Sequence, residues 1–446
     1  MPAQQPTRNP LWSRAWKRTP LVLCGALLAA CGSGGDDSAD WLFPLWVETS
    51  VLVVDVDGNG RPDVVTTATL SPAMGVFEGW VKVRLQASAG VFSPPQQYRT
   101  GLQAWTVKAA DVDGDGRQDL VVAEPAKVWD NQVSPGGAWL LRQDPARAGH
   151  FLPPTQLLAG PNVYDLDLAD LTGDGIVDIA LADAGTGASR VVILPQNPAV
   201  RGTFLAPLDL SMPGPSTKLV ARDLNADGRA DLTTAFTSAT RPDFSYDTSI
   251  GMWFKDSVGF TPSPWLTTFT YGPAAHLAVT DFNADGLADV AAYFNRFDER
   301  AVPAIRVMRQ TADRTWESAI DTPMPVDTVK GRDGQAVGDL NGDGRLDFAF
   351  VGTYPEGTTS DGFSIIKSDL TLLLQSTDGR FVPTTVIPMP IDSTRVAAGD
   401  VNGDGRTDLV VYGSTSSSSG GNADQTLLLL QSSATAGQFL APVTLP

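Results

Sequence analysis

A nine-residue run from Asp111 to Asp119 carries four carboxylates, at positions 1, 3, 5 and 9. Gly114 and Gly116 separate them, and glycine lets the backbone turn sharply enough to wrap the side chains around one ion. Calcium accepts about six to eight oxygen ligands in flexible geometry, and it prefers carboxylates and carbonyls. The spacing therefore predicts a calcium loop in which the four aspartates bind through their side chains. Arg117, at position 7, would bind through its carbonyl.

This run occurs seven times along the chain. Its first aspartates lie 53 to 61 residues apart, and a period of about 50 residues is typical of a solenoid, a propeller or an array. Position 2 is apolar and position 6 is glycine in all seven copies. The predicted ligands, at positions 1, 3, 5, 7 and 9 of successive copies, are Asp55, Asp57, Asn59, Arg61 and Asp63; Asp111, Asp113, Asp115, Arg117 and Asp119; Asp170, Thr172, Asp174, Ile176 and Asp178; Asp223, Asn225, Asp227, Arg229 and Asp231; Asp281, Asn283, Asp285, Leu287 and Asp289; Asp339, Asn341, Asp343, Arg345 and Asp347; and Asp400, Asn402, Asp404, Arg406 and Asp408. We therefore expect up to seven bound Ca²⁺ ions.

The run has two other interpretations, a solvated turn and an EF-hand. A single copy is equally consistent with a solvated turn, because Asp, Asn and Gly dominate turns, but seven copies at fixed spacing favour metal loops. An EF-hand needs flanking helices and a bidentate glutamate at position 12. Position 12 here is apolar or small, as at Val122, and it falls inside a predicted strand. The EF-hand interpretation is therefore excluded.

Short apolar runs of strand length flank each loop. In the second repeat we expect four strands, at about 105–110, 120–123, 138–142 and 155–158. Four-stranded sheets repeated radially form a β-propeller. The sequence thus predicts an all-β fold over residues 46–446, a seven-bladed β-propeller with a calcium-binding loop between the first two strands of each blade. Residues 41–45 could add an outer strand at the point where the ring closes.

The repeated pattern Asp-x-Asp-Gly-Asp-Gly-x-x-Asp after a short strand resembles the FG-GAP and VCBS repeats of the integrin α-chain β-propeller and its bacterial relatives. The resemblance covers nearly all of the chain beyond residue 45. The Gly-Ala-Pro part of the integrin pattern is not evident in these repeats, so the chain is more similar to the bacterial VCBS type. The resemblance implies a calcium-binding propeller used for binding or adhesion, and it does not imply integrin ligand specificity.

Residues 1–30 look like a signal peptide. Four Lys and Arg residues precede an apolar stretch, Leu21 to Ala30, which is too short to span a bilayer as a helix. The sequence that ends this stretch, Leu28-Ala29-Ala30-Cys31, resembles the lipobox of bacterial lipoproteins. The resemblance implies cleavage before Cys31 and lipidation of its thiol. An ordinary secretory signal with a chance cysteine is the alternative.

Residues 31–45 would then hold the lipidated Cys31 and a flexible tether rich in Gly, Ser and Asp. Cleavage removes Cys24, which leaves the mature chain no second cysteine for an internal disulfide. Gly32 is not the aspartate that retains such lipoproteins in the inner membrane. By the same resemblance we expect an exported outer-membrane lipoprotein, on the periplasmic or the cell-surface face, held to the membrane by its lipid anchor.

The chain is acidic, with a formal net charge of −18. Many of its aspartates stand at predicted ligand positions, where bound calcium would balance them. Without metal, carboxylates crowded in one loop repel each other. Nucleic-acid binding needs a basic patch to neutralise phosphates, so we expect no nucleic-acid partner.

The segments between the second and third strands are uneven in length, and they lie on the face opposite the predicted calcium loops. They span 71–79, 124–137, 238–249, 354–369 and 414–422. Binding usually lies on such irregular loops held by a rigid scaffold, so we expect a protein or polysaccharide ligand there. The aromatic candidates are Phe77, Trp129, Phe244, Tyr246 and Tyr354.

A binding module is the leading functional hypothesis, and a carbohydrate-binding lectin is the first alternative. Four tryptophans could stack on sugars, although their positions on predicted strands also suit core packing: Trp80, Trp105, Trp139 and Trp253. A propeller-based polysaccharide lyase or hydrolase is the weakest alternative. The two histidines, His150 and His276, lie in different repeats, and neither Gly-x-Ser-x-Gly nor His-Glu-x-x-His occurs. We therefore expect that the chain is not an enzyme and has no catalytic residues.

Overall fold

The structure is a computed structural model that describes residues 45–73, 76–129, 132–185, 189–240, 246–264, 266–269, 274–294, 304–323, 334–358, 364–416 and 422–446. The chain divides into two compact units, Met1–Trp41 and Leu42–Pro446, and every described residue belongs to the second. The predicted signal peptide, Cys31 and all of the tether except its last residue lie outside the described residues. All named elements within them are strands, and no helix there is long and apolar enough to cross a membrane.

Seven antiparallel sheets follow one another along the chain, and in each sheet the strands pair in sequence order. The fourth sheet has one additional short strand, β21 (Thr267–Phe269), which pairs with β19. The blades, in order, are β1 (Leu45–Val54), β2 (Asp63–Ala73), β3 (Val76–Arg84) and β6 (Gln96–Arg99); β7 (Val107–Ala110), β8 (Asp119–Glu124), β11 (Gly137–Leu141) and β12 (Thr155–Ala159); β13 (Val163–Ala169), β14 (Asp178–Asp183), β15 (Arg190–Leu194) and β16 (Leu208–Ser211); β17 (Ser216–Arg222), β18 (Asp231–Thr240), β19 (Tyr246–Lys255) and β20 (Phe260–Pro262); β22 (Ala274–Thr280), β23 (Asp289–Phe294), β24 (Ala304–Met308) and β25 (Ile320–Pro323); β26 (Gly334–Gly338), β27 (Asp347–Thr358), β28 (Ser364–Gln375) and β29 (Phe381–Met389); β30 (Asp392–Gly399), β31 (Asp408–Ser416), β32 (Asn422–Leu429) and β33 (Val443–Thr444).

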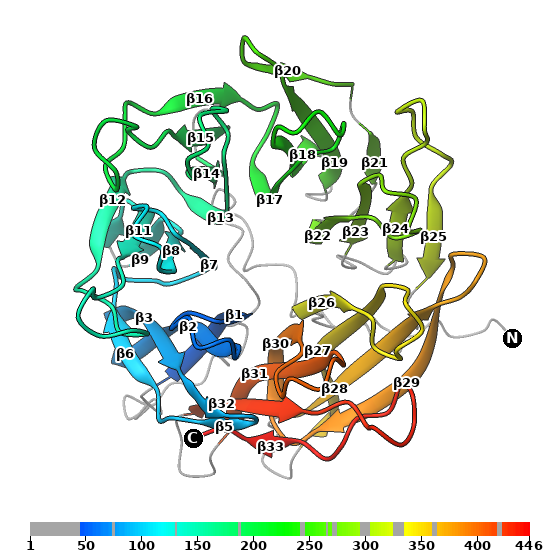
Figure 1. The fold of residues 1–446 in the computed structure, drawn as a ribbon. Helices are drawn as coiled ribbons and strands as arrows, with labels where there is room; N and C mark the ends of the chain where they lie inside the picture. Colours follow the sequence, from blue (N-terminus) through cyan, green and yellow to red (C-terminus); the bar gives the residue numbers. More distant parts are fainter. Residues whose placement is uncertain are drawn as a thin grey trace, which may run out of the picture. The chain divides into compact units, whose positions relative to one another are not determined.

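Figure 1 shows these sheets arranged in a ring, with the first strand of each sheet nearest the centre. Two short hairpins accompany the blades: β4 (Gln86–Ser88) pairs with β5 (Val91–Phe92), and β9 (Lys127–Trp129) pairs with β10 (Gln132–Ser134). The predicted all-β, seven-bladed β-propeller is therefore confirmed. Each acidic run lies between the first and second strands of its blade, as the sequence predicts.

The core of this unit lies between the blades. Seven clusters of buried apolar side chains each draw on two neighbouring sheets, as where Val121 and Leu140 of the second blade meet Ile179 of the third. Such residues alternate along each strand, because a strand points successive side chains to opposite faces. Burial of one Val, Leu or Ile side chain stabilises the fold by about 1.5–3 kcal/mol, so the clusters hold neighbouring blades together.

The ring closes where the first blade packs on the last. Val64 lies in one apolar cluster with Val410 and Leu428, and Lys82 Nζ contacts Asp424 Oδ2 at 2.7 Å. The prediction that residues 41–45 add an outer strand is wrong at Leu45, which is the only one of them that the structure describes. Leu45 begins β1, the innermost strand of the first blade, because it continues the pairing register with β2 opposite Ser71.

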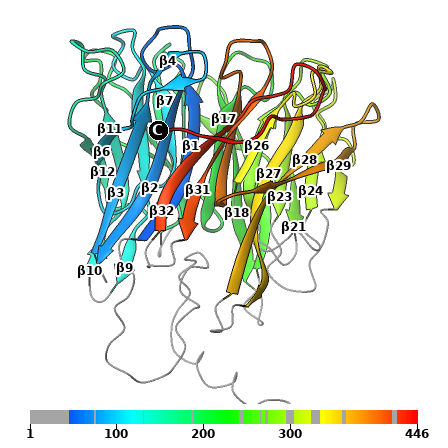
Figure 2. The ribbon, with the colours of Figure 1, turned by 90° about the horizontal axis from the view of Figure 1, so that it is seen from below.

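Several segments that we predicted to be irregular loops between the second and third strands are largely paired strands. The pairing of β18 with β19 extends to Thr240 opposite Tyr246, and that of β27 with β28 extends to Thr358 opposite Ser364. These segments are rich in Thr and Ser, and β-branched Thr fits the pleated backbone well. Figure 2 shows β9 and β10 on the side of the ring opposite β4, so the two ends of the blades form two separate faces.

Candidate metal loops

Each acidic run winds around the carboxylate of its first aspartate. In the first loop, Asp55 Oδ1 accepts the amide of Gly58 at 2.8 Å, and Asp55 Oδ2 accepts the amide of Gly60 at 2.7 Å. The position-6 amide makes the same bond in all seven loops, at 2.7–2.9 Å. The predicted position-1 residues are thus fixed at the centre of each loop by the backbone itself.

Position 4 separates two kinds of loop. In five loops it is glycine with a positive φ, and in the fourth and fifth loops it is Ala226 with φ 54° and Ala284 with φ 60°. An L-residue pays a steric penalty in this region because its Cβ approaches the following carbonyl. The five glycine amides donate to the position-1 carboxylate. Among the described hydrogen bonds, Ala226 and Ala284 make no such bond.

The position-9 aspartate forms a clamp that all seven blades share. Its side chain is at most 1% exposed in every copy. In the sixth blade, Asp347 Oδ2 accepts the amide of Leu340 at 2.9 Å, and Asp347 Oδ1 accepts the amide of Gln375 at 2.7 Å. The equivalent two bonds recur in the other blades at 2.7–3.2 Å. This carboxylate therefore ties the loop to the end of the third strand.

The burial of these carboxylates changes their acidity. Burial raises the pKa of four of them to about 6, namely Asp63, Asp119, Asp289 and Asp347. Burial also raises the pKa of the other three, Asp178, Asp231 and Asp408. In all of them except Asp178, repulsion from other aspartates of the same loop raises the pKa further. A nearby cation would favour the charged form, so the electrostatics of each loop suit a bound metal ion.

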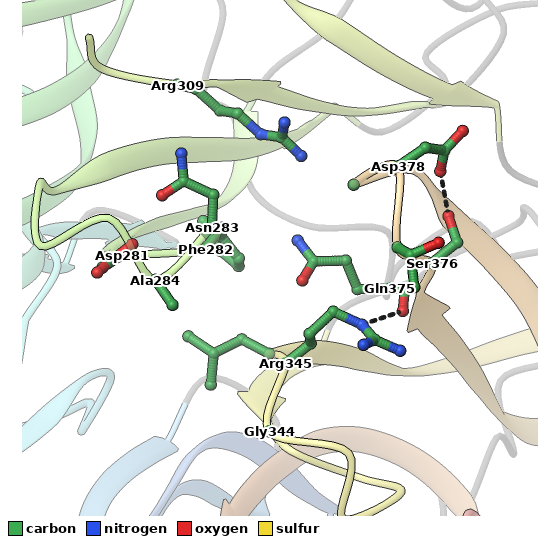
Figure 3. Close-up of a pocket in the computed structure, with 13 residues that line it drawn as sticks. Asp281, Phe282, Asn283, Ala284, Arg309, Gly344, Arg345, Gln375, Ser376 and Asp378 are labelled. Atoms are coloured by element: carbon green, nitrogen blue, oxygen red, sulfur yellow. Dashed lines mark hydrogen bonds between the residues drawn. The ribbon is translucent and has the colours of Figure 1, made fainter. Parts of the chain in front are cut away.

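The position-5 side chains also accept hydrogen bonds from the backbone. Their Oδ1 atoms accept the position-7 amide at 2.8–3.0 Å in every loop. In four loops the position-7 arginine also pairs with the position-5 carboxylate. In the sixth loop, Arg345 Nε also donates to the carbonyl of Gln375 at 3.0 Å (Figure 3). The position-7 arginine side chains thus pair with a predicted ligand of the same loop. The role of the position-7 carbonyl as a ligand stays a prediction.

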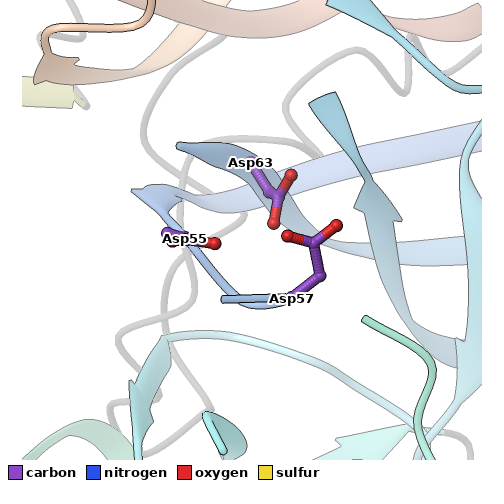
Figure 4. Close-up of side chains that lie close together, drawn as sticks. All are labelled: Asp55, Asp57 and Asp63. Carbon is purple, nitrogen blue, oxygen red and sulfur yellow. The ribbon is translucent and has the colours of Figure 1, made fainter. Parts of the chain in front are cut away.

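Two loops bring three carboxylates together within 4.8 Å. These are Asp55, Asp57 and Asp63 in the first loop (Figure 4), and Asp111, Asp113 and Asp115 in the second. Among the described residues, the other five loops form no such group; four of them have Asn at position 3 and the third has Thr172. All the donors are oxygen atoms, which a hard cation such as calcium prefers. The residues present therefore fit calcium, most closely in the first two loops.

Glutamine at the end of the third strand is a structural feature that the sequence reasoning missed. Gln143 Nε2 donates to the carbonyl of Val56 at 2.5 Å, and Gln86 Nε2 donates to that of Val401 at 2.7 Å. Gln196 makes the same contact with Val112. Each bond joins one blade to the acidic loop of the preceding blade. The signal was the recurrence of glutamine at this place in six of the seven repeats, with Lys255 in the fourth.

The tryptophans proposed to stack on sugars have partners within the protein. Trp139 Nε1 donates to Glu124 at 2.6 Å, and Trp80 Nε1 donates to Glu78 at 3.2 Å. Trp105 packs edge-on against Tyr164, and Trp253 is buried in an apolar cluster. These contacts favour a packing role for all four.

The other candidate residues that the structure describes come from several different blades. Phe77 is half-buried. The backbone of Trp129, Tyr246 and Tyr354 lies in β9, β19 and β27. Phe244 lies outside the described residues. His150 lies 3.2 Å from Arg147, and His276 stacks on Tyr293, so the two histidines have different surroundings.

Comparisons with known proteins agree with the repeat and the fold. A family model described as FG-GAP-like repeat matches residues 55–122, 170–234 and 357–411, and one described as FG-GAP repeat matches residues 104–141. A search of curated protein sequences gave no match.

The solved structures that are similar to the chain include three at low identity. The exotype rhamnogalacturonan lyase YesX is 11% identical, with a TM-score of 0.41, over 86% of this chain and 70% of that one. The rhamnogalacturonan lyase YesW is 15% identical, with a TM-score of 0.38, over 86% of this chain and 76% of that one. The V. cholerae biofilm matrix protein Bap1 is 12% identical, with a TM-score of 0.37, over 91% of this chain and 83% of that one.

These structures correct one prediction. We expected that the chain is not an enzyme, and this is contradicted by two similar structures that are named as lyases. The sequence argument relied on missing hydrolase and protease motifs, and other chemistries do not need those motifs. At such identities the likeness concerns the fold alone.

The acidic loop between the first two strands of every blade, the matches to FG-GAP repeats and the ring of seven sheets lead to one conclusion: the chain forms a seven-bladed β-propeller that contains FG-GAP repeats, matched over residues 55–141, 170–234 and 357–411.

Proposed function

We propose that this propeller is a calcium-binding module of the cell envelope that binds a protein or polysaccharide partner. The observation that carries the proposal is the position-9 clamp, a fully buried carboxylate repeated in all seven blades. A buried charge destabilises the folded state unless an opposite charge compensates it. Neutral amides are the hydrogen-bond donors to this carboxylate, and its pKa stays raised in their presence. Up to seven Ca²⁺ ions, one in each loop, would supply the missing positive charge.

Within each loop the chain's own residues have distinct roles. The position-1 carboxylate organises the turn. The side-chain oxygens at positions 3 and 5, which belong to a carboxylate, an amide or the hydroxyl of Thr172, and the position-7 carbonyl would complete the oxygen donors. The position-9 carboxylate connects this site to the third strand of the blade. Ions bound in the loops would therefore stiffen each blade and, through the glutamines, its contact with the preceding blade.

The proposed partner surface is the face opposite the acidic loops. The hairpins that reach this face differ between blades, from 12-residue strands in β27 and β28 to 5-residue β15. Rigid scaffolds commonly carry binding residues on such variable edges. Because much of this edge is paired strand, we propose that it presents a preformed surface with little ordering on binding.

The location of the protein is part of the proposal. Cys31 would carry the lipid that anchors the chain to the outer membrane, with the propeller on the periplasmic or cell-surface face. Cys31→Ser should release the protein from the membrane fraction into the periplasm or the medium. Equal membrane retention of the variant would contradict the anchor and leave the propeller's binding function to be tested separately.

The binding function is tested with the purified mature protein in calcium. Envelope proteins and a polysaccharide array are probed side by side, and the same incubations are assayed for newly formed sugar ends so that cleavage is not mistaken for weak binding. The proposal predicts saturable retention of one partner that is lost with EGTA and regained with calcium. Retention of no envelope protein and no polysaccharide would contradict it.

A further inference from the structure

A cavity of about 170 Å³ opens between the fifth and sixth blades on the acidic-loop face (Figure 3). Its walls come from residues 281–284 of the fifth loop, residues 344–346 of the sixth loop and the turn 375–379 that follows β28. Arg309, the residue after β24, projects into it. One water occupies roughly 30 Å³ of the liquid, so the cavity has room for one charged group of a ligand.

The guanidinium of Arg309 lacks a partner in this cavity. Its Nε atom is buried without a hydrogen-bond acceptor, and no described residue forms an ion pair with it. The backbone of Gly379 lies against the group so closely that a Cβ at that position would collide with it. A buried donor left unpaired destabilises the fold, and more so when it is charged. The fold thus holds the guanidinium of Arg309 in place without an acceptor for its Nε–H group.

The second blade contains the same arginine with its charge satisfied. Arg142 follows β11 as Arg309 follows β24, and each directly precedes the recurrent glutamine, Gln143 or Gln310. Arg142 Nε lies 3.7 Å from Asp113 Oδ2, and Arg142 Nη2 donates to the carbonyl of Gly202 in the next blade. Asp113 stands at position 3 of its acidic loop.

Position 3 of the fifth loop is Asn283, which has no charge to offer. Its side chain is also engaged within the loop, where Nδ2 donates to Asp285 Oδ2 at 2.9 Å and Oδ1 accepts the amide of Asp285 at 3.1 Å. The exchange of a carboxylate for a carboxamide therefore removes the anion that satisfies the equivalent arginine. Arg309 keeps the position of Arg142 but loses its counter-ion.

The other charged side chains that line the cavity have hydrogen-bond partners within the protein. Asp378 accepts from Ser376 and from Arg380 Nη1 at 2.8 Å. Arg345 pairs with Asp343 and donates to Gln375. Asp281 accepts the amides of Asp285 and Gly286. Among the charged side chains that line the cavity, Arg309 is therefore the one with no hydrogen-bond partner in the described part of the chain.

We propose that this cavity binds an oxyanion, a carboxylate or a sulfate group of a larger ligand, with Arg309 as the charged anchor. The planar guanidinium matches such groups with two parallel hydrogen bonds. The site lies on the acidic-loop face, so it is separate from the partner surface proposed above and does not depend on it.

The test is a calorimetric titration of the calcium-loaded protein in a buffer free of carboxylate and sulfate. Galacturonate and sulfate are the probes, and galactose is the neutral control. Saturable binding of either oxyanion without binding of galactose is expected, and the stronger of the two identifies the source of the anion. Absence of saturable binding by both oxyanions would overturn the proposal.

Three variants locate the site. Arg309→Gln should weaken binding by about tenfold or more, since a hydrogen bond to a charged group contributes about 1.5–3 kcal/mol. Asn283→Asp, which rebuilds the internal partner seen in the second blade, should weaken it to a similar extent without removing the arginine. The matched control, Arg142→Gln, should bind as the unaltered protein does. Unchanged binding in Arg309→Gln, or an equal loss in Arg142→Gln, would contradict the assignment.

Discussion

The two ends of the blades differ in how closely their contacts repeat from one blade to the next. At the acidic-loop end, the position-9 clamp and the position-6 amide bond recur in all seven blades with nearly the same distances. At the opposite end, hairpin length varies between blades, from the 5-residue β15 to the 12-residue β27 and β28, and so do the buried polar groups. Glu48, for example, is buried near Asp424 and Arg395 where the first and last blades meet. The acidic-loop end thus repeats the same contacts in every blade, while the opposite end varies between blades.

Removal of metal should have the largest effect, because it acts on all seven copies at once. A ligand that binds only the folded state stabilises it by about 2.7 kcal/mol per site at a hundredfold excess over Kd. Seven such sites would exceed the ~5 to 15 kcal/mol stability of a typical domain. EGTA should therefore lower the melting temperature sharply, and magnesium should restore it poorly because it demands small octahedral sites. A melting curve unchanged by EGTA would mean that the loops are only turns.

Loss of one clamp should lower the free energy of unfolding more than loss of one side chain's hydrogen bonds at the opposite end. Asp347→Ala removes both bonds of one clamp in a fully buried site and should lower the free energy of unfolding by about 3–5 kcal/mol. Ser368→Ala, toward the other end of the same blade, removes the contacts with Gly352 and Ser393 and should cost about 1 kcal/mol. Chemical denaturation of the two variants checks this. Equal losses would erase the distinction between the ends.

The opposite end should also respond to pH through Glu48. Burial raises the pKa of Glu48 to about 7 from its ordinary value of 4.5, with Asp424 adding repulsion and Arg395 opposing it. Lys82 also faces this group. Because the folded protein holds the proton more tightly, this stabilisation is complete below about pH 4.5 and is lost as the pH rises through 7.

Glu48→Gln isolates that effect. In saturating calcium, the unfolding free energy of the unaltered protein minus that of the variant should fall by roughly 3 kcal/mol between pH 5 and pH 9. A difference that stays constant over this range, or rises with pH, would contradict the assigned direction.

The smallest expected effect concerns the two loops that depart from the repeat at position 4. Ala226 and Ala284 hold positive φ angles where the other loops have glycine. Ala284→Gly should stabilise the protein by about 0.5–1 kcal/mol, since the removed strain exceeds the added freedom of the unfolded chain. A matched change in the opposite direction, Gly342→Ala, should destabilise it. Thermal melts of both variants would show the sign, and destabilisation by Ala284→Gly would refute the strain.

The sequence predicted the repeated end well because its signals are local. Spacing of Asp and Gly within nine residues defines each loop, and the adjoining apolar runs define the strands, so the seven blades followed directly. The glutamine contact was missed because it joins residues far apart in sequence, as Gln143 and Val56 are. The paired hairpins at the other end were interpreted as loops because Ser and Thr suit both states, and strand pairing decides between them. The unmatched charge of Arg309 required two neighbouring blades to be seen together.

The number of calcium ions bound per chain tests most directly whether the acidic loops are metal sites. The mature protein is equilibrated against trace calcium in excess magnesium, and bound calcium is measured by mass spectrometry of the metal against protein concentration. Close to seven ions per chain are expected. Asp111→Ala, which removes the organising carboxylate of the second loop, should lower the number by one. A protein that binds no calcium, or one whose bound calcium is unaffected by this substitution, would contradict the claim that the acidic loops are metal sites.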